Sequence, residues 1–294
     1  MKRTKMPVLL SALLMAALLS GCSQSGQDSS QRTKTEGLDQ LKDIQVISRE
    51  EGSGTRSAFA ELVGFVGNEE GKQDLTTDKA QIAENAEEVC KLVGENTSAV
   101  GYISLGTVPE DGGIKVLKVN GTQASLEEKS YPLSRTFYLA YSGQLSELEQ
   151  DFLSYVHGAG QDIVAEAYIP VAKSSSFLSN KAKGTLKIGG STSVAPLIAN
   201  LANAYMKINS NAKIIVQSSD SSDGLTKAMS GEFDFGMSSR DLKDYEMELL
   251  DYEAIAEDDI AVIVNAENPL EDITLEELKN VFTGMFVKWE ELNQ

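Results

Sequence analysis

Residues 48–59 read Ser-Arg-Glu-Glu-Gly-Ser-Gly-Thr-Arg-Ser-Ala-Phe, a turn rich in glycine and hydroxyl side chains. An apolar strand pattern at 44–47 precedes this turn, and a helical pattern follows it. Such a turn offers free backbone N–H groups and the positive end of a helix dipole to an anion. Arg49 adds a guanidinium, and Ser53 and Thr55 add hydroxyl donors. By itself the pattern fits an ordinary capped helix equally well, because glycine-rich loops before helices are common.

Two further segments have the same character. Residues 188–197 (Ile-Gly-Gly-Ser-Thr-Ser-Val-Ala-Pro-Leu) pass from a strand pattern through a Gly/Ser/Thr turn into a helical pattern. Residues 214–225 (Ile-Ile-Val-Gln-Ser-Ser-Asp-Ser-Ser-Asp-Gly-Leu) do the same. Three strand-to-helix turns of one character favour several helix N-termini that converge on a single anion.

Strand and helix patterns alternate along the rest of the chain. Strand patterns stand at 98–105, 114–119 and 136–141, and a helical pattern follows at 145–157. This alternation predicts an α/β fold, and the length fits one large domain or two medium ones. Ligands of open α/β sheets bind outside the carboxyl ends of the strands, where these turns lie.

The N-terminus has the pattern of a lipoprotein leader. A basic start and a short apolar run, 8–19, end in Leu-Ser-Gly-Cys, which predicts a signal peptide over 1–21. The resemblance to bacterial lipoproteins implies cleavage before Cys22 and lipid on its sulfur; a plain secretory signal is the alternative. The polar residues 22–37 are typical of a flexible tether. With Cys22 lipidated, Cys90 has no partner, so no disulfide framework is predicted.

Taken together, the chain resembles the phosphate-binding proteins of phosphate ABC transporters, which are periplasmic-type solute receptors. The resemblance is carried by four segments, SREEGSGTRSAF, GGSTSVAPL, SSDSSDG and FDFGMSSRDL, and it extends over most of the chain from about residue 44. It implies a two-lobed periplasmic-binding-protein fold of type II with the ligand cleft between the lobes. It also implies inorganic phosphate as the ligand, an ABC permease with its ATPase subunits as partners, and a lipid-anchored location on the extracytoplasmic face of the cell membrane.

The order of these segments differs from that of the usual family member, in which GSTSVAPL comes first. We therefore predict a circular permutation, in which residues 173–184 link the segments that form the two termini of the usual family member. A fragment of a tandem duplication is the alternative. The permutation predicts one lobe from 38–105 and 260–294, and a second lobe from 106–259.

The resemblance also implies the residues of the site. The phosphate-binding residues are expected to be Arg49, Ser53, Gly54, Thr55, Thr192, Ser193, Ser221 and Asp234. Asp234 corresponds to a carboxylate that accepts the proton of phosphate, which would reject sulfate because sulfate has no such proton. A cap of a turn is the alternative role for Asp234. Glu51 is either a partner of Arg49 or a solvated charge.

Composition and motifs argue against other classes of protein. A formal net charge of −18 disfavours binding to nucleic acid. With one His, no Gly-x-Ser-x-Gly elbow and no Gly-Lys-Ser/Thr after the glycine-rich loop, neither a hydrolase nor a nucleotidase is predicted. We expect no cofactor and no metal site. A sensor without transport, a receptor for another oxyanion such as sulfate or molybdate, and a non-binding permuted relative stay open.

Overall fold

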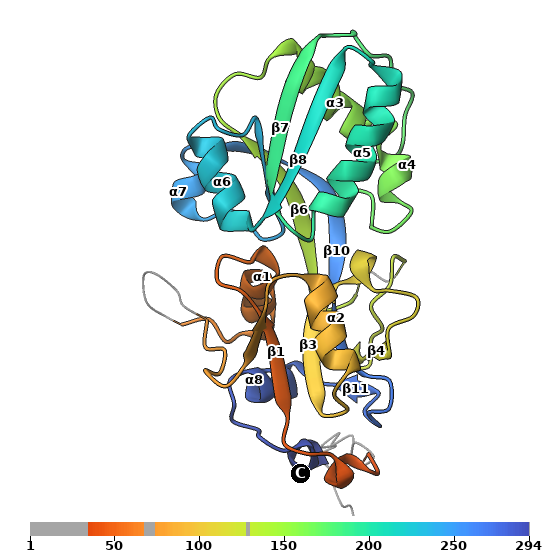
Figure 1. Ribbon diagram of the computed structural model, residues 1–294, viewed down its shortest axis with the longest axis vertical. Helices are drawn as coiled ribbons and strands as arrows, with labels where there is room; N and C mark the ends of the chain where they lie inside the picture. Colours follow the sequence, from red (N-terminus) through yellow and green to blue (C-terminus); the bar gives the residue numbers. More distant parts are fainter. Residues whose placement is uncertain (1–34, 68–73, 128–129, 294) are drawn as a thin grey trace, which may run out of the picture. The chain divides into compact units, whose positions relative to one another are not determined.

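The computed structural model describes residues 35–67, 74–127 and 130–293, and these described residues belong to one compact unit (Figure 1). The predicted signal peptide, the lipidation site at Cys22 and nearly all of the predicted tether lie outside the described residues. In the part of the chain that is described, no helix is long and apolar enough to cross a membrane.

A single nine-stranded mixed sheet runs through this unit in the order β2-β1-β3-β10-β6-β9-β7-β8, with β4 paired to β10. The compact unit divides into two lobes, and each lobe has its own hydrophobic core. The first lobe holds β1 (Gln45–Arg49), α1 (Gly54–Val63), β2 (Gln81–Ala83), α2 (Ala86–Gly94), β3 (Ala99–Ser104), β4 (Ile114–Val116), β5 (Lys118–Val119), β11 (Asp272–Ile273) and α8 (Leu275–Phe282). The second lobe holds β6 (Ser134–Tyr141), α3 (Glu147–His157), α4 (Gln161–Val164), β7 (Gly184–Ser191), α5 (Ala195–Ile208), β8 (Ala212–Ser219), α6 (Ser221–Met229), β9 (Phe235–Ser238) and α7 (Asp244–Met247).

The long strand β10 (Asp251–Asn265) joins the two lobes. Residues 251–259 pair antiparallel with β6 in the second lobe, and residues 260–264 pair antiparallel with β3 in the first. β6 starts beside this junction, because Asp259 pairs with Ser134. The chain therefore passes between the lobes along two neighbouring strands, which is the geometry of a hinge.

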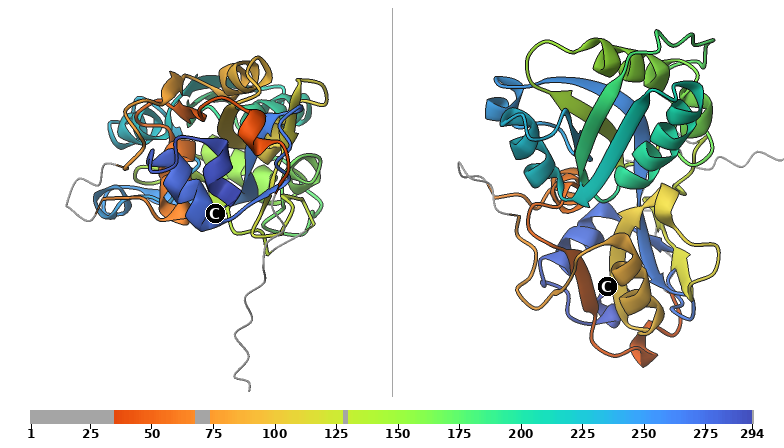
Figure 2. Two further views of the ribbon diagram at one scale, coloured as in Figure 1. Left: turned by 90° about the horizontal axis from the view of Figure 1, so that it is seen from below. Right: turned by 45° about the horizontal axis from the view of Figure 1, so that its top comes forward.

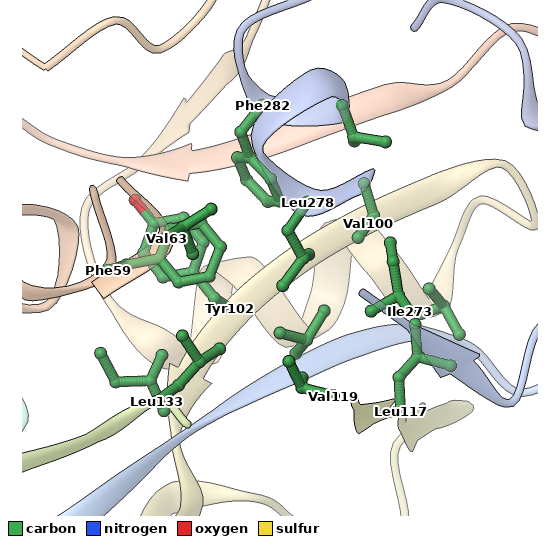
Figure 3. Packing of buried hydrophobic residues seen from close by; sticks show 14 of the residues in the cluster. Phe59, Val63, Val100, Tyr102, Leu117, Val119, Leu133, Ile273, Leu278 and Phe282 are labelled. Atoms are coloured by element: carbon green, nitrogen blue, oxygen red, sulfur yellow. The ribbon is translucent and has the colours of Figure 1, made fainter. Parts of the chain in front are cut away.

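The core of the first lobe combines aliphatic side chains with a group of aromatic rings around α1, β3 and α8 (Figure 3). Phe59 stacks on Tyr102 with ring centroids 4.1 Å apart, and Phe282 meets Phe59 edge-on at 4.7 Å. Each buried ring contributes roughly 1.5–3 kcal/mol through its removal from water. This core fixes α1 against the sheet, and the turn before α1 carries Arg49, so the core also positions the turn.

Helix α8 starts where its sequence predicts. Thr274 accepts a hydrogen bond from Glu277 N at 3.1 Å, and Glu277 in turn accepts one from Thr274 N at 2.7 Å. This reciprocal pair is a capping box, which satisfies two of the free N–H groups at the helix start.

The predicted boundary between the lobes needs a correction. Residues 106–133 belong to the first lobe, because β4 pairs with residues 263–265 and the side chains of Leu117 and Leu133 lie in the first core. The second lobe is the continuous segment 134–259, shorter than the predicted 106–259.

Residues 173–183 run without helix or strand up to the start of β7 at Gly184. This segment is nevertheless held in place: Asp151 of α3 accepts hydrogen bonds from Ser179 Oγ at 2.6 Å and from Asn180 N at 2.8 Å. At the far end of the first lobe, the two ends of the described chain meet, since Thr35 N donates to Asn293 Oδ1 at 2.9 Å.

Candidate functional site

Three strand-to-helix turns meet where the two lobes face each other. β7, β8 and β9 are parallel, so their carboxyl ends share one edge of the second lobe. The turn between β1 and α1 approaches that edge from the first lobe, and the views in Figure 2 place α1 beside the end of α6. The local pattern of each turn thus becomes one site only through the packing of the lobes.

Side-chain hydrogen bonds cross from one lobe to the other between these turns. Arg49 Nη2 donates to Thr192 Oγ1 at 2.9 Å, and the hydroxyl oxygens of Thr55 and Ser193 lie 2.7 Å apart. The hydroxyl pair is buried. Both contacts exist only while the lobes are closed, so the structure shows the closed arrangement.

The backbone of Gly54 in the first lobe faces the hydroxyls of the second lobe. A Cβ atom added there would stand 2.2 Å from Ser221 Oγ and 2.6 Å from Ser239 Oγ. Only glycine fits this position without separating the lobes. The backbone of α1 therefore comes directly against the hydroxyls of the second lobe.

Arg49 is the charged centre of the site, and it is 1% exposed. Glu50 takes a bidentate pair from its Nε and Nη2 atoms, both at 2.7 Å. The third nitrogen, Nη1, is buried and has no hydrogen-bond partner among the described residues. An unpaired buried guanidinium nitrogen is costly, so it indicates a site where a ligand supplies the acceptor. The suggested partner Glu51 is exposed, so the pairing of Arg49 with Glu51 was wrong and Glu50 takes that role.

The helix starts around Arg49 add donors. Ser53 caps α1 by accepting from Arg56 N at 3.4 Å, and Asp220 caps α6 by accepting from Asp223 N at 2.8 Å. The first N–H groups of a helix have no partner within the helix, and they carry the positive end of its dipole. Together with the hydroxyls, they make a neutral set of donors that suits an oxyanion.

A second arginine holds the Arg49 turn in shape. Arg56 Nη1 donates to the carbonyl oxygen of Arg49 at 2.9 Å, and Arg56 forms a fork with Asp74 at 2.7 and 3.0 Å. Burial would raise the pKa of Asp74, but the Arg56 guanidinium outweighs burial and holds the pKa below its ordinary value. The ion pair is therefore fully formed at neutral pH.

Asp234 is the one predicted site residue that lies elsewhere. Its carboxylate accepts a hydrogen bond from Lys187 N at 2.6 Å, ahead of the start of β9. Lys187 precedes Ser191 by four residues of β7, which is about 13 Å along a strand. Asp234 therefore sits at the opposite end of these parallel strands, and the prediction that it faces the ligand was wrong.

The residues that β7 and β9 present at the site are hydroxyls that the motifs did not single out. Ser191 Oγ donates to Ser239 Oγ at 2.8 Å, and Ser221 Oγ accepts from Ser239 N at 3.2 Å. All three serines are at most 2% exposed. The run of hydroxyls after Phe235 was the available signal, but only the strand direction shows which of its members reaches the site.

Other candidate centres lie away from this site. An open surface cavity of about 530 Å³ is lined by second-lobe residues 161–162, 165 and 170–174, none of which was predicted to bind ligand. Polar contacts fill the closed interface instead, so this cavity and the predicted site residues do not coincide. Within the described ranges no group of three His, Cys, Asp or Glu side chains could hold a metal ion.

Two α/β lobes that close over converging helix starts define a solute-binding protein. The chain belongs to the PBP superfamily: residues 27–159 and 175–294 match the PBP superfamily domain. Among its relatives are proteins named phosphate-binding protein PstS 2. That of Streptococcus agalactiae serotype V is 36% identical over 305 residues and covers 100% of both chains. That of Streptococcus pneumoniae TIGR4 is 39% identical over 256 residues, which is 85% of this chain and 87% of the relative.

A crystal structure of a phosphate-binding protein of a phosphate ABC transporter, from Streptococcus pneumoniae TIGR4, shares the fold. Its TM-score is 0.72 at 38% identity, and the match covers 85% of this chain and 99% of that one. The phosphate-binding protein PstS of Bacillus subtilis matches over a shorter part, 36% identical over 117 residues or 38% of each chain. Because the alignment with the Streptococcus agalactiae relative covers both chains completely, that relative has the same order of segments as this chain.

Proposed function

We propose that this chain captures inorganic phosphate between its two lobes and delivers it to an ABC importer. The observation that carries the proposal is the buried Nη1 of Arg49, which has no hydrogen-bond partner among the residues that the structure describes. The names of the relatives supply the identity of the anion. They describe binding proteins and no reaction, so we assign no catalysis.

The proposed ligands are Arg49, Ser53, Gly54, Thr55, Thr192, Ser193 and Ser221, to which the structure adds Ser191 and Ser239. Phosphate at neutral pH carries close to two negative charges, and hydroxyls, backbone N–H groups and one guanidinium are strong donors to its oxygens. A net charge of −18 repels the anion at long range. The affinity must therefore come from aligned dipoles within the closed interface.

Closure is the step that completes the site. The bonds from Arg49 to Thr192 and from Thr55 to Ser193 join the lobes only when they are together. A ligand that contacts both lobes binds the closed form better than the open one, so it shifts the population towards closure. Release to the permease then requires the lobes to separate again.

We place the protein on the extracytoplasmic face of the cell membrane, anchored by lipid on Cys22, where an ABC permease with its ATPase subunits takes the phosphate. The support is the lipoprotein pattern and the likeness to a phosphate-binding protein of a phosphate ABC transporter. Cys22→Ser should move the protein from the membrane fraction to the medium. A variant that stays in the membrane fraction would contradict the anchor.

The circular permutation also stays a proposal. Three observations support it: the contact of Thr35 with Asn293, the irregular segment 173–183 and the partial match to the Bacillus subtilis relative. Joining 293 to 35 and opening the chain within 173–183 should give a folded binding protein. If the rearranged chain does not fold, the reading as a permutation loses its support.

Calorimetric titration of the folded protein with phosphate tests the main proposal. One site per chain with saturable heat is the expected result. No heat from a protein with a normal unfolding transition would refute it. Tighter binding of sulfate or molybdate would instead support a receptor for another oxyanion.

A further inference from the structure

A buried ion pair sits on the two strands that connect the lobes. Arg135 of β6 and Asp258 of β10 are direct partners across these strands. Arg135 donates to Asp258 Oδ2 from Nε at 3.0 Å and from Nη2 at 2.8 Å. Their side chains are 3% and 1% exposed. Two hydrophobic side chains of similar volume would occupy these positions at a lower desolvation cost. The stability of the fold therefore does not by itself explain the ion pair.

The pair is connected to both lobes. Ser104, the last residue of β3 in the first lobe, donates to Asp258 Oδ1 at 2.8 Å. In the second lobe, Arg135 Nη1 donates to the carbonyl oxygen of Ser239 at 3.2 Å. The Ser239 hydroxyl faces the backbone of Gly54 in the first lobe. Arg135 therefore lies between the hinge and the site.

Arg135 also interacts electrostatically with Arg49. Burial lowers the pKa of Arg135, Asp258 raises it, and the positive charge of Arg49 lowers it further. Arg135 Nη1 is bonded to the carbonyl of Ser239 and Arg49 Nη2 to the hydroxyl of Thr192, so both guanidinium groups border the same closed interface, where their like charges repel. Each guanidinium group has its own carboxylate partner: Glu50 for Arg49 and Asp258 for Arg135. The closed interface without ligand therefore contains two ion pairs whose guanidinium groups face the same interface.

We propose that Arg135 is a positioning residue that couples anion occupancy to lobe closure. This inference rests on the proposed phosphate site. Without an anion, repulsion between Arg49 and Arg135 opposes closure. A bound dianion attracts both guanidinium groups, and because it carries about twice the charge of either one, its attraction to Arg135 outweighs their mutual repulsion.

Opposite charge changes should therefore have opposite effects on binding. Arg135→Met keeps most of the side-chain volume and removes the positive charge, so phosphate should bind at least about tenfold more weakly. Asp258→Asn removes the negative charge and leaves Arg135 uncompensated, so phosphate should bind more tightly even though the fold becomes less stable. A pair that only stabilises the hinge would give weaker binding in both variants.

Two further variants keep the test independent of folding. The double variant Arg135→Met with Asp258→Asn leaves no unpaired buried charge, and it should still bind phosphate more weakly than the unchanged protein. Arg135→Lys keeps the charge, so it should recover most of the affinity that Arg135→Met loses. Calorimetry on the full chain gives the affinities, and thermal unfolding of each variant shows that it is folded.

The anion-free proteins supply a second readout. A pair of fluorophores, one on each lobe, should report a more closed anion-free form for Arg135→Met than for the unchanged protein. Equal affinities of the unchanged protein and the double variant, or weaker binding of Asp258→Asn, would overturn the coupling. If the unchanged protein itself does not bind phosphate, the proposed function fails, and that outcome is distinct from either result.

Discussion

Gly54→Ala should block closure while leaving each lobe intact. The new Cβ would stand 2.2 Å from Ser221 Oγ, where 3.4 Å is an ordinary contact, so the two lobes must move apart by about 1 Å. Ser221 cannot turn away freely, because its oxygen accepts from Ser239 N at 3.2 Å. Gly54 has no positive φ, so alanine suits its backbone conformation.

The loss of affinity can be worked from the contacts that this movement breaks. The hydrogen bonds from Arg49 to Thr192 and between Thr55 and Ser193 are 2.9 and 2.7 Å long. Moving the lobes about 1 Å further apart breaks both bonds. At about 1 kcal/mol each, their loss weakens phosphate binding by about 30-fold. This figure is a lower bound, since contacts of the anion with one of the lobes are lost as well.

Calorimetric titration with phosphate measures the loss, and thermal unfolding without phosphate provides the companion measurement. Alanine at the first residue of α1 should leave the anion-free unfolding temperature unchanged or slightly higher, because glycine is the weaker helix former. Gly112→Ala is the matched control, as its added Cβ meets nothing nearer than 3.1 Å. Phosphate affinity of Gly54→Ala equal to that of Gly112→Ala would refute the reasoning.

Three more changes test separate parts of the site. Arg49→Met should weaken phosphate binding by at least about a hundredfold, because a charged hydrogen bond contributes about 1.5–3 kcal/mol and the lobe contact to Thr192 is lost as well; unchanged affinity in calorimetry would place the anion elsewhere. Asp234→Asn should leave the ratio of phosphate to sulfate affinity unchanged, because its carboxylate faces Lys187 N; a shift in that ratio would restore its predicted role. Asp74→Asn should lower the free energy of unfolding by about 1–3 kcal/mol at pH 7. Since the folded pKa of Asp74 is depressed, that stabilisation exists above about pH 4 and disappears as the pH falls through the folded value, so denaturant unfolding at pH 3 should show a smaller difference.

Local features of this protein follow from its sequence. Each of the three turns forms between a strand and a helix that the pattern of apolar residues already marks, and Ser53, Asp220 and Thr274 cap helices from within one turn of chain. Caps and turns depend on residues that are three or four positions apart. That proximity is why the residue pattern predicts the turns and their caps, whereas the expected ligands within the turns were implied by the resemblance to the phosphate-binding family.

Sites assembled from distant segments depended on the tertiary structure. Asp234 and Ser239 are five residues apart, yet only the parallel pairing of β9 with β7 puts Ser239 at the site and Asp234 at the far end. The ion pair of Arg135 with Asp258 joins positions 123 residues apart through strand register alone. Strand pairing brings together residues whose separation in the chain is arbitrary, so no local pattern of hydrophobicity or turn chemistry records it. The sequence by itself therefore determined the three strand-to-helix turns, and the tertiary structure decided which hydroxyls, carboxylates and guanidinium groups surround them.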